Sequence, residues 1–306
     1  MERPYILHMF TPGRQMSPFD INMAADAGYQ FVVPYAEVGL DAIAGLTQDT
    51  IFSRGPKGAT RTGIFIGGRD VRLAADMLDA AEAAMFKPFV VSLMADPSGS
   101  YTTAAAMVAC VEAALQQNHG HGLAGQRVVI VGGTGPVGRI AGVLAAQAGA
   151  DVQLSSRNGI DVAEEAARRT GERFGATLHG VSGGDRAALR SSLEHCDVLL
   201  ATAAAGKQVV AADDLAHARR LKVAADVNAV PPEGIAGVGV MDDAKPIAAS
   251  GPALGIGALA IGNVKYQVQN RMLVQMRGAE KPVRLSFAEA FATAREVCAQ
   301  KTQPKG

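Results

Sequence analysis

A glycine pattern near the middle of the chain limits the possible folds more than any other feature. The apolar run Val128 to Val131 predicts a buried strand, and Gly133, Gly135 and Gly138 follow it as G-x-G-x-x-G before an apolar helical pattern. In such a turn the first glycine permits a tight bend, the second lets backbone approach a pyrophosphate, and the third lets the helix pack closely on the strand. The N–H groups at the helix N-terminus favour an anion. The pattern therefore predicts a dinucleotide-binding domain of the Rossmann type.

The residues after the second strand of this domain bear on the choice of dinucleotide. A NAD-specific domain usually places Asp or Glu there, against the ribose hydroxyls, but this chain has Ser155, Ser156 and Arg157. Arg157 can pair with a 2′-phosphate and no carboxylate repels it, which favours NADP while still admitting NAD. Small residues after the fourth strand, and Asp and Asn after the fifth, add further contacts. The predicted cofactor-binding residues are Gly133, Thr134, Gly135, Pro136, Val137, Gly138, Ser155, Ser156, Arg157, Ala203, Asp226 and Asn228.

Strand and helix patterns alternate along the first 120 residues, which indicates a largely parallel sheet. The predicted fold class is therefore α/β with two domains. We expect an N-terminal α/β domain over residues 1–120 that binds substrate, and a Rossmann-type parallel-sheet domain over 121–250. C-terminal helices over 251–306 are expected to pack back on the first domain. Residues 50–53 are predicted as a short strand.

A polar loop, Asp96-Pro-Ser-Gly-Ser-Tyr-Thr-Thr103, follows an apolar strand and opens a long helix. Open α/β sheets bind ligands outside the carboxyl ends of their strands, so the loop lies where a ligand is expected. Helix capping and turn formation explain one or two of its polar groups. We expect the remaining groups to contact substrate, and the candidates are Ser98, Ser100, Thr102 and Thr103.

The composition excludes several classes of protein. Lysine and arginine balance aspartate and glutamate at 29 each, so no basic surplus indicates a nucleic-acid or membrane partner. The N-terminus lacks a signal-peptide core, and no apolar run is long enough to span a bilayer. The three cysteines are far apart in sequence and predict reduced thiols in a cytoplasmic protein. His119 and His121 belong to a polar linker, and no metal site is predicted.

Six stretches of the chain resemble the bacterial NAD(P)-dependent methylene-tetrahydromethanopterin dehydrogenases of methylotrophs, together with relatives that also use tetrahydrofolate. The most specific are the Asp-x-x-Gly-Ser-x-Thr-Thr run and the Asp-x-Asn-Ala-x-Pro-Pro run. The resemblance implies a two-domain subunit with a pterin cleft between the domains. It also implies a step of one-carbon (formaldehyde) oxidation, in which the methylene bridge is oxidised to the methenyl cation and hydride passes to NAD(P)⁺. The matching stretches are 50–57, 63–68, 96–106, 132–138, 226–232 and 254–257.

This chemistry requires few catalytic groups. Hydride loss from a carbon between two nitrogens leaves a delocalised cation, so no general acid or base is needed, and the sequence shows no histidine-centred constellation. A carboxylate near the developing cation stabilises it, and we take Asp20 and Asp96 as the catalytic candidates, with Asp226 behind them. We expect Lys57 and Lys265 to bind the anionic tail of the substrate.

Three other functions remain open from the residues. Methylene-tetrahydrofolate dehydrogenase uses the same chemistry on a smaller pterin. A shikimate-dehydrogenase-like reductase needs a proton donor, typically a Lys–Asp pair, for which Lys57 with Asp96 could serve. A redox-sensing NADP-binding module is the non-enzyme alternative. The glycine-rich C-terminal segment and the apolar face of helix 101–115 favour a homo-oligomer, whereas the in-cell cofactor and the residue at the transferred hydride are not specified.

Overall fold

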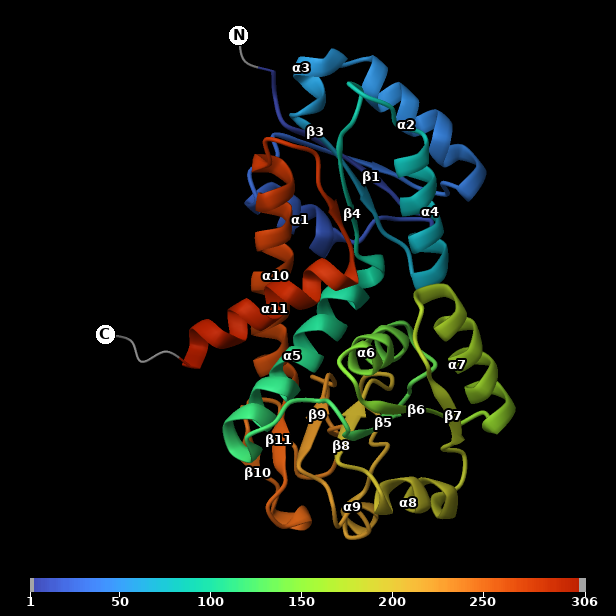
Figure 1. Ribbon diagram of the computed structural model, residues 1–306, viewed down its shortest axis with the longest axis vertical. Coiled ribbons are helices and arrows are strands. Elements are labelled where there is room, and N and C mark those ends of the chain that lie inside the picture. The colour runs from blue at the N-terminus through green and yellow to red at the C-terminus, as the bar shows by residue number, and fades with distance from the viewer. Residues whose placement is uncertain (1–2, 303–306) are drawn as a thin grey trace. The chain divides into compact units, whose positions relative to one another are not determined.

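The computed structural model describes residues 3–302, which fall into two compact units (Figure 1). Unit 1 comprises the residues up to 102 together with 266–293, and unit 2 comprises 103–265 and the residues from 294 onward. The division therefore falls within helices α5 (Ser100–His119), α10 (Ala258–Gly278) and α11 (Phe287–Thr302), and not near residue 120 as the sequence suggested. A continuous helix carries no turn signal, which explains why local patterns did not indicate this division.

Unit 1 contains a five-stranded sheet in which every pair of strands is parallel. Its order is β12-β4-β3-β1-β2, so β1 lies between β2 and β3, and the chain reverses its progress across the sheet there. Ligands bind open α/β sheets at such a reversal, outside the carboxyl ends of the strands. The strands are β1 (Ile6–Phe10), β2 (Phe31–Tyr35), β3 (Thr62–Ile66), β4 (Ser92–Ala95) and β12 (Arg284–Leu285).

Local sequence signals predict the start of helix α4 in unit 1, but they fail at the end of helix α2. Asp70 caps α4 as its sequence position predicts, because its carboxylate accepts the backbone N–H groups of Arg72 and Leu73. The strand predicted over residues 50–53 is wrong. These residues end α2, where the Thr50 hydroxyl donates to the Leu46 carbonyl one turn earlier. The helices are α1 (Pro18–Asp26), α2 (Ile43–Phe52), α3 (Gly55–Ala59) and α4 (Val71–Ala83), with 3₁₀ turns at Leu40–Ala42 and Pro97–Gly99.

Unit 2 contains a seven-stranded sheet in the order β10-β11-β9-β8-β5-β6-β7. All neighbours are parallel except β10, and the six parallel strands have the order 3-2-1-4-5-6 of the doubly wound dinucleotide-binding fold. The α/β class with parallel sheets is thereby confirmed. The strands are β5 (Arg127–Val131), β6 (Asp151–Ser156), β7 (His179–Ser182), β8 (Val198–Ala201), β9 (Val223–Asp226), β10 (Lys245–Pro246) and β11 (Leu254–Ile256).

Helices bury both faces of this sheet, which explains the continuous apolar run in β5. Figure 1 shows α6 (Pro136–Gln147) and α7 (Ile160–Phe174) on one side of it, and α8 (Arg186–Glu194) and α9 (Ala212–Leu215) on the other. Val129 and Val131 belong to an apolar cluster that includes residues of α8 and α9, whereas Ile130 lies beside Gly142 of α6. A 3₁₀ turn lies at Ala248–Ser250. No helix between residues 3 and 302 is both long and apolar enough to cross a membrane.

Asp197 directly precedes β8 and stabilises the amino end of this strand. The glycine turn lies at the other end of the sheet, where the strands have their carboxyl ends. The Asp197 side chain is 3% exposed, and it accepts the Arg127 N–H at 3.0 Å and the Arg220 Nη2 at 3.2 Å. Lys222 Nζ lies 3.6 Å away. Burial by itself raises the pKa of Asp197, but the N–H of Arg127 and the two cations outweigh burial, so the pKa of this carboxyl is lowered.

Replacing Asp197 by Asn should lower the free energy of unfolding by about 1–3 kcal/mol at neutral pH, because charged hydrogen bonds are lost. The folded pKa lies below the unfolded value of about 3.9, so the stabilisation is complete above about pH 4 and disappears as the pH falls through the folded pKa. Urea unfolding from pH 7 to pH 3 measures this. The exposed Asp213→Asn is the control, and a pH-independent difference between Asp197→Asn and the native chain would contradict the account.

Candidate functional site

The glycine turn between β5 and α6 is closed by contacts that leave no room for side chains. A Cβ at Gly138 would lie 2.7 Å from both Gly133 Cα and Thr202 Oγ1. A Cβ at Gly133 would lie 2.8 Å from a strand carbonyl. Gly132, which precedes the pattern, has φ +73°, and a Cβ there would lie 2.7 Å from the Ala203 nitrogen. The turn is therefore packed against the ends of β5 and β8, and its outer part at Gly135 begins α6.

Arg139, one residue beyond the last glycine of the pattern, links the turn to helix α7 through hydrogen bonds. Its Nε donates to the Thr134 carbonyl at 2.8 Å. Its Nη1 donates to the Ala166 carbonyl at 3.1 Å and to the buried Thr170 hydroxyl at 2.9 Å, both on α7. The guanidinium therefore ties the glycine turn to a second helix. Sequence analysis missed this positioning residue, because only the tertiary structure brings α7 beside it.

A cavity of about 550 Å³ opens over this turn, within the usual size range of small-molecule sites. It lies at the carboxyl ends of β5, β6 and β8. Six of the predicted cofactor residues line it, namely Thr134, Gly135, Ser155, Ser156, Arg157 and Ala203. Four others, Gly133, Pro136, Val137 and Gly138, form the turn and the start of α6 without lining the cavity. The lining residues that sequence analysis missed are Val131, Gly132, Asn158, Gly183, Gly184, Asp185, Arg186, Leu189, Thr202, Ala204, Lys207, Gln208 and Val209.

Three cationic side chains line the cavity, and two of them have no partner within the described chain. Arg186 pairs with the fully buried Asp214. By contrast, among residues 3–302 neither Arg157 nor Lys207 makes a hydrogen bond or ion pair through its side chain. Both are exposed, so their charges are available to an anionic ligand. Together with the N-terminus of α6, they make this cavity suited to a phosphorylated molecule.

Asp226 and Asn228 do not line this cavity, and their polar atoms have other partners. The Asp226 carboxylate accepts the backbone N–H groups of Asn228, Gly234 and Ile235 at 2.9, 2.6 and 3.2 Å. The Asn228 side chain accepts the Gly206 N–H at 3.0 Å. Burial raises the pKa of Asp226, and the three N–H groups oppose that rise without cancelling it. Both residues therefore close the loop after β9, and their contact with a cofactor stays a prediction.

The polar loop after β4 uses most of its side chains internally. Asp96 is fully buried, and its carboxylate accepts the Tyr101 N–H at 2.9 Å and both the N–H and the hydroxyl of Thr102, at 3.2 and 2.6 Å. Ser100 donates to the Pro97 carbonyl at 2.5 Å, and Ser98 donates to the Gly68 carbonyl at 2.7 Å. Internal hydrogen bonds therefore use four of these side chains, more than the one or two expected. Ser98 is exposed and Thr103 is half-buried, so these two keep some access to a ligand.

Asp20 is a buried carboxylate on α1, at 2% exposure. Gln269 Nε2, from α10, donates to its Oδ1 at 2.7 Å. Both residues lie within unit 1. Lys265 lies four positions before Gln269 on the same helix, so the two side chains share one helical face, and Lys265 is half-buried. The sequence did not indicate Gln269, because a lone glutamine in an apolar helix carries no motif.

Lys57 lies at the wrong end of the sheet to meet Asp96. It belongs to α3, which precedes the amino end of β3, whereas Asp96 follows the carboxyl end of β4. Because β3 and β4 are parallel neighbours, the amino end of β3 and the carboxyl end of β4 lie at opposite ends of the strands. The proposed Lys57–Asp96 proton donor is therefore wrong, and nothing places Lys57 beside the Asp96 loop. No cluster of three metal-ligating side chains occurs among the described residues.

Comparison with known proteins gives two near full-length relatives. The model of the family "Methylene-tetrahydromethanopterin dehydrogenase, N-terminal" matches residues 18–98. A Methylorubrum extorquens protein named NAD(P)-dependent methylenetetrahydromethanopterin dehydrogenase is 47% identical over 95% of this chain and 98% of its own length. A second protein of that organism, "Bifunctional protein MdtA", is 30% identical over the same shares.

Solved structures show the fold alone, because their sequence identity is low. Shikimate 5-dehydrogenase from Listeria monocytogenes, in complex with shikimate and NAD, aligns over 96% of each chain with a TM-score of 0.55 and 15% identity. Quinate dehydrogenase from Corynebacterium glutamicum, in complex with NAD, aligns over 95% of this chain and 98% of its own with a TM-score of 0.53 and 11% identity.

Replacing Gly138 by Ala should abolish tight dinucleotide binding. The added methyl group must push α6 away from Gly133 and Thr202, which moves the N–H groups at the helix end. We expect the Kd for a dinucleotide to rise by about 100-fold, as when a bound ligand loses two or more hydrogen bonds. Calorimetry measures it. The control is Gly262→Ala on α10, where a Cβ meets nothing within 4 Å, and equal binding by both variants would contradict the assigned role of the turn.

Proposed function

The chain belongs to the family of NAD(P)-dependent methylene-tetrahydromethanopterin dehydrogenases, and from that membership we propose its reaction and site. It is an oxidoreductase that moves a hydride from the methylene bridge of 5,10-methylene-tetrahydromethanopterin to NAD(P)⁺, producing the methenyl form. The observation that carries this proposal is the 47% identity over 95% of the chain. The reaction needs no proton donor, which agrees with the separation of Lys57 from Asp96.

The cavity of unit 2 fits the dinucleotide by its chemistry. Gly135 and the N-terminus of α6 offer N–H groups to the pyrophosphate. Ser155 and Ser156 end β6 and Arg157 follows it, where a ribose is bound in this fold. Arg157 has no protein partner in the described chain and no carboxylate occupies the end of β6, so we assign it to a 2′-phosphate. When bound, NAD(P)⁺ supplies the hydride acceptor at nicotinamide C4. NADP is the preferred form and NAD is also accepted.

Two buried carboxylates are available to stabilise the cationic product. Asp96 is bound by two N–H groups and a hydroxyl, and these contacts hold it rigidly at the carboxyl end of β4. Asp20 is 2% exposed and accepts a hydrogen bond from the amide of Gln269. A carboxylate held in a low-dielectric site stabilises a developing cation strongly. We therefore assign the electrostatic role to Asp20 and Asp96. Lys265, Ser98 and Thr103 are the retained candidates for binding the substrate.

We further infer a cytoplasmic homo-oligomer. Leu259, Tyr266 and Val274 on α10 are 45%, 47% and 41% exposed, and their spacing of seven and eight residues places them along one face of the helix. An exposed apolar stripe of this kind is typical of a subunit interface.

The reaction is tested by initial rates at 340 nm with methylene-tetrahydromethanopterin and, in parallel, with methylene-tetrahydrofolate. We expect turnover of the first with both NADP⁺ and NAD⁺. In Arg157→Ala, kcat/KM for NADP⁺ should fall by about 10- to 100-fold, as a charge-assisted contact is lost, while kcat/KM for NAD⁺ changes little.

The control is Arg168→Ala, which removes an exposed arginine of α7 that pairs with the surface residues Glu165 and Glu172. Turnover of the folate alone would move the protein to the folate branch, and no turnover of either pterin would refute the proposed reaction. An equal loss with both nucleotides would refute the role of Arg157.

Replacing Asp20 by Asn should lower kcat by about 10- to 100-fold with a smaller change in KM, because an oriented charge acts mainly on the transition state. Asn keeps the volume and an oxygen acceptor for Gln269. Asp26→Asn, an exposed acid at the end of the same helix, is the control. An unchanged kcat in Asp20→Asn, with unchanged folding by circular dichroism, would remove Asp20 from the site.

A further inference from the structure

Two of the three cysteines lie side by side although 188 residues separate them in sequence. Cys110 lies on α5 and Cys298 on α11, and their Sγ atoms are 3.9 Å apart. Both thiols are free, and each residue is 7% exposed. Both belong to unit 2, and neither contributes to the dinucleotide cavity or to the residues assigned to hydride transfer.

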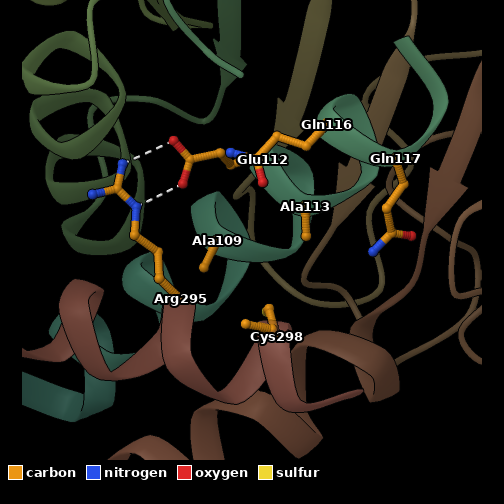
Figure 2. A pocket seen from close by; sticks show the side chains of 8 residues that line it. Ala109, Glu112, Ala113, Gln116, Gln117, Arg295 and Cys298 are labelled. Carbon is orange, nitrogen blue, oxygen red and sulfur yellow. Dashed lines mark hydrogen bonds and ion pairs between the residues drawn. The ribbon is translucent and has the colours of Figure 1, made fainter. Parts of the chain in front are cut away.

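Two cavities reach this pair of sulfurs. Cys298 lines a cavity of about 430 Å³ together with small alanines and the amides of Gln116 and Gln117 (Figure 2). Both cysteines line a second cavity of about 220 Å³, which also contains Asp243 and Lys301. Little of either side chain is exposed, but each cavity is large enough to admit a molecule of a few heavy atoms to a sulfur. Small solutes therefore have access that bulky reagents lack.

The surroundings give the two thiols different reactivity. The two sulfurs are in hydrogen-bond contact, and the contact with Cys110 together with the Lys301 ammonium lowers the pKa of Cys298 in spite of its burial. The same contact and burial raise the pKa of Cys110. Asp243 and Glu112, the acids that face the pair, oppose the effect of Lys301 on Cys298 without overcoming it. Thiolate is the reactive form, and Cys298 lines both cavities whereas Cys110 lines only the smaller one, so we take Cys298 as the attacking thiol and Cys110 as its partner.

Cys196 provides an internal comparison. It is fully buried under the β5–β8 part of the sheet, and its Sγ donates to the Val198 carbonyl at 3.0 Å. Burial raises its pKa to about 12. Neither of the two cavities around Cys110 and Cys298 includes it. A structural thiol of this chain therefore differs from the pair in access and in nearby partners.

We propose that Cys298 and Cys110 form a dithiol site that reduces small hydroperoxides and closes to a disulfide linking α11 to α5. The Cys298 thiolate attacks the peroxide, the O–O bond breaks, and the sulfur becomes a sulfenic acid while the other oxygen leaves as an alcohol or water. Cys110 then attacks the sulfenic sulfur, and the hydroxyl leaves with the thiol proton as water. In sum, two thiols and one hydroperoxide give one disulfide, one alcohol (or water) and one water, and two electrons pass from sulfur to oxygen.

The packing around the pair allows the bond to form. Closure brings the sulfurs from 3.9 Å to the disulfide length of about 2.0 Å. The neighbouring side chains are the small Ala109, Ala113 and Ala114, which line the two cavities and leave space for the sulfurs to turn. Glu112 and Arg295 join the same two helices through hydrogen bonds of 2.6 and 2.8 Å, so the helices are already held together beside the pair (Figure 2).

The test uses the reduced full-length protein, treated with hydrogen peroxide, then alkylated and mapped by mass spectrometry without reduction. We expect a Cys110–Cys298 cross-linked peptide pair, a loss of two hydrogens from the intact mass, full reversal by dithiothreitol, and Cys196 still open to alkylation after unfolding. Cys110→Ser should accumulate a sulfenic acid on Cys298 that dimedone traps. Cys298→Ser should slow the oxidation of Cys110 by about tenfold or more, because its thiol is protonated. Cys196→Ser is the matched control and should behave as the native chain.

Three results would overturn the proposal. The first is survival of both thiols at peroxide concentrations that oxidise free cysteine. The second is oxidation of Cys196 as rapidly as that of Cys298, and the third is oxidation of Cys110 in Cys298→Ser at the native rate. Circular dichroism of each serine variant establishes that it is folded, so slow oxidation in a variant is not a folding defect.

Discussion

The contact between Gly133 and Gly138 is the constraint on which the dinucleotide site depends. It brings the first turn of α6 against the end of β5, and it works only because neither residue has a side chain. Thr202, which directly follows β8, reinforces it by donating to the Val131 and Gly132 carbonyls at 3.2 and 3.1 Å. Arg139 fixes the same turn to α7. The anion-binding end of α6 is thereby held in place before any ligand arrives, which lowers the entropy cost of binding.

Buried carboxylates have different uses in this chain, and their partners distinguish them. Asp197 and Asp214 pair with cations and stabilise the Rossmann-type unit. Asp197 does so at the amino end of β8, and Asp214 does so on α9, where it pairs with Arg186 of the cavity wall. Asp226 accepts three N–H groups and shapes a loop. Asp96 combines a structural position with a location at the carboxyl end of a strand, whereas Asp20 accepts from a neutral amide. A reaction that creates positive charge is favoured by a buried carboxylate, and Asp20 and Asp96 are the two that we propose for this role.

Local patterns predicted the regular elements well, and they failed where chain segments distant in sequence determine the structure. The capping role of Asp70 and the close packing of Gly138 depend on residues a few positions away in sequence, so local patterns predicted both correctly. The strand β11 was missed because Gly255 interrupts its apolar run, and its pairing with β9 supplies the stability that its own residues lack. Lys57 and Asp96 looked like a possible pair until the parallel register of β3 and β4 separated them.

The sequence by itself determined the glycine turn, the alternation of strands and helices, and the absence of a carboxylate after β6, because each depends on residues within one turn or one strand. The motifs quoted in order along the chain were also sufficient to identify its family. Only the tertiary structure decided which polar groups remain available to ligands. Backbone N–H groups of the loop that follows β9 took up the carboxylate of Asp226, and packing of α5 on α11 brought Cys110 to Cys298. A side chain's availability depends on everything packed around it, and one-dimensional spacing does not contain that information.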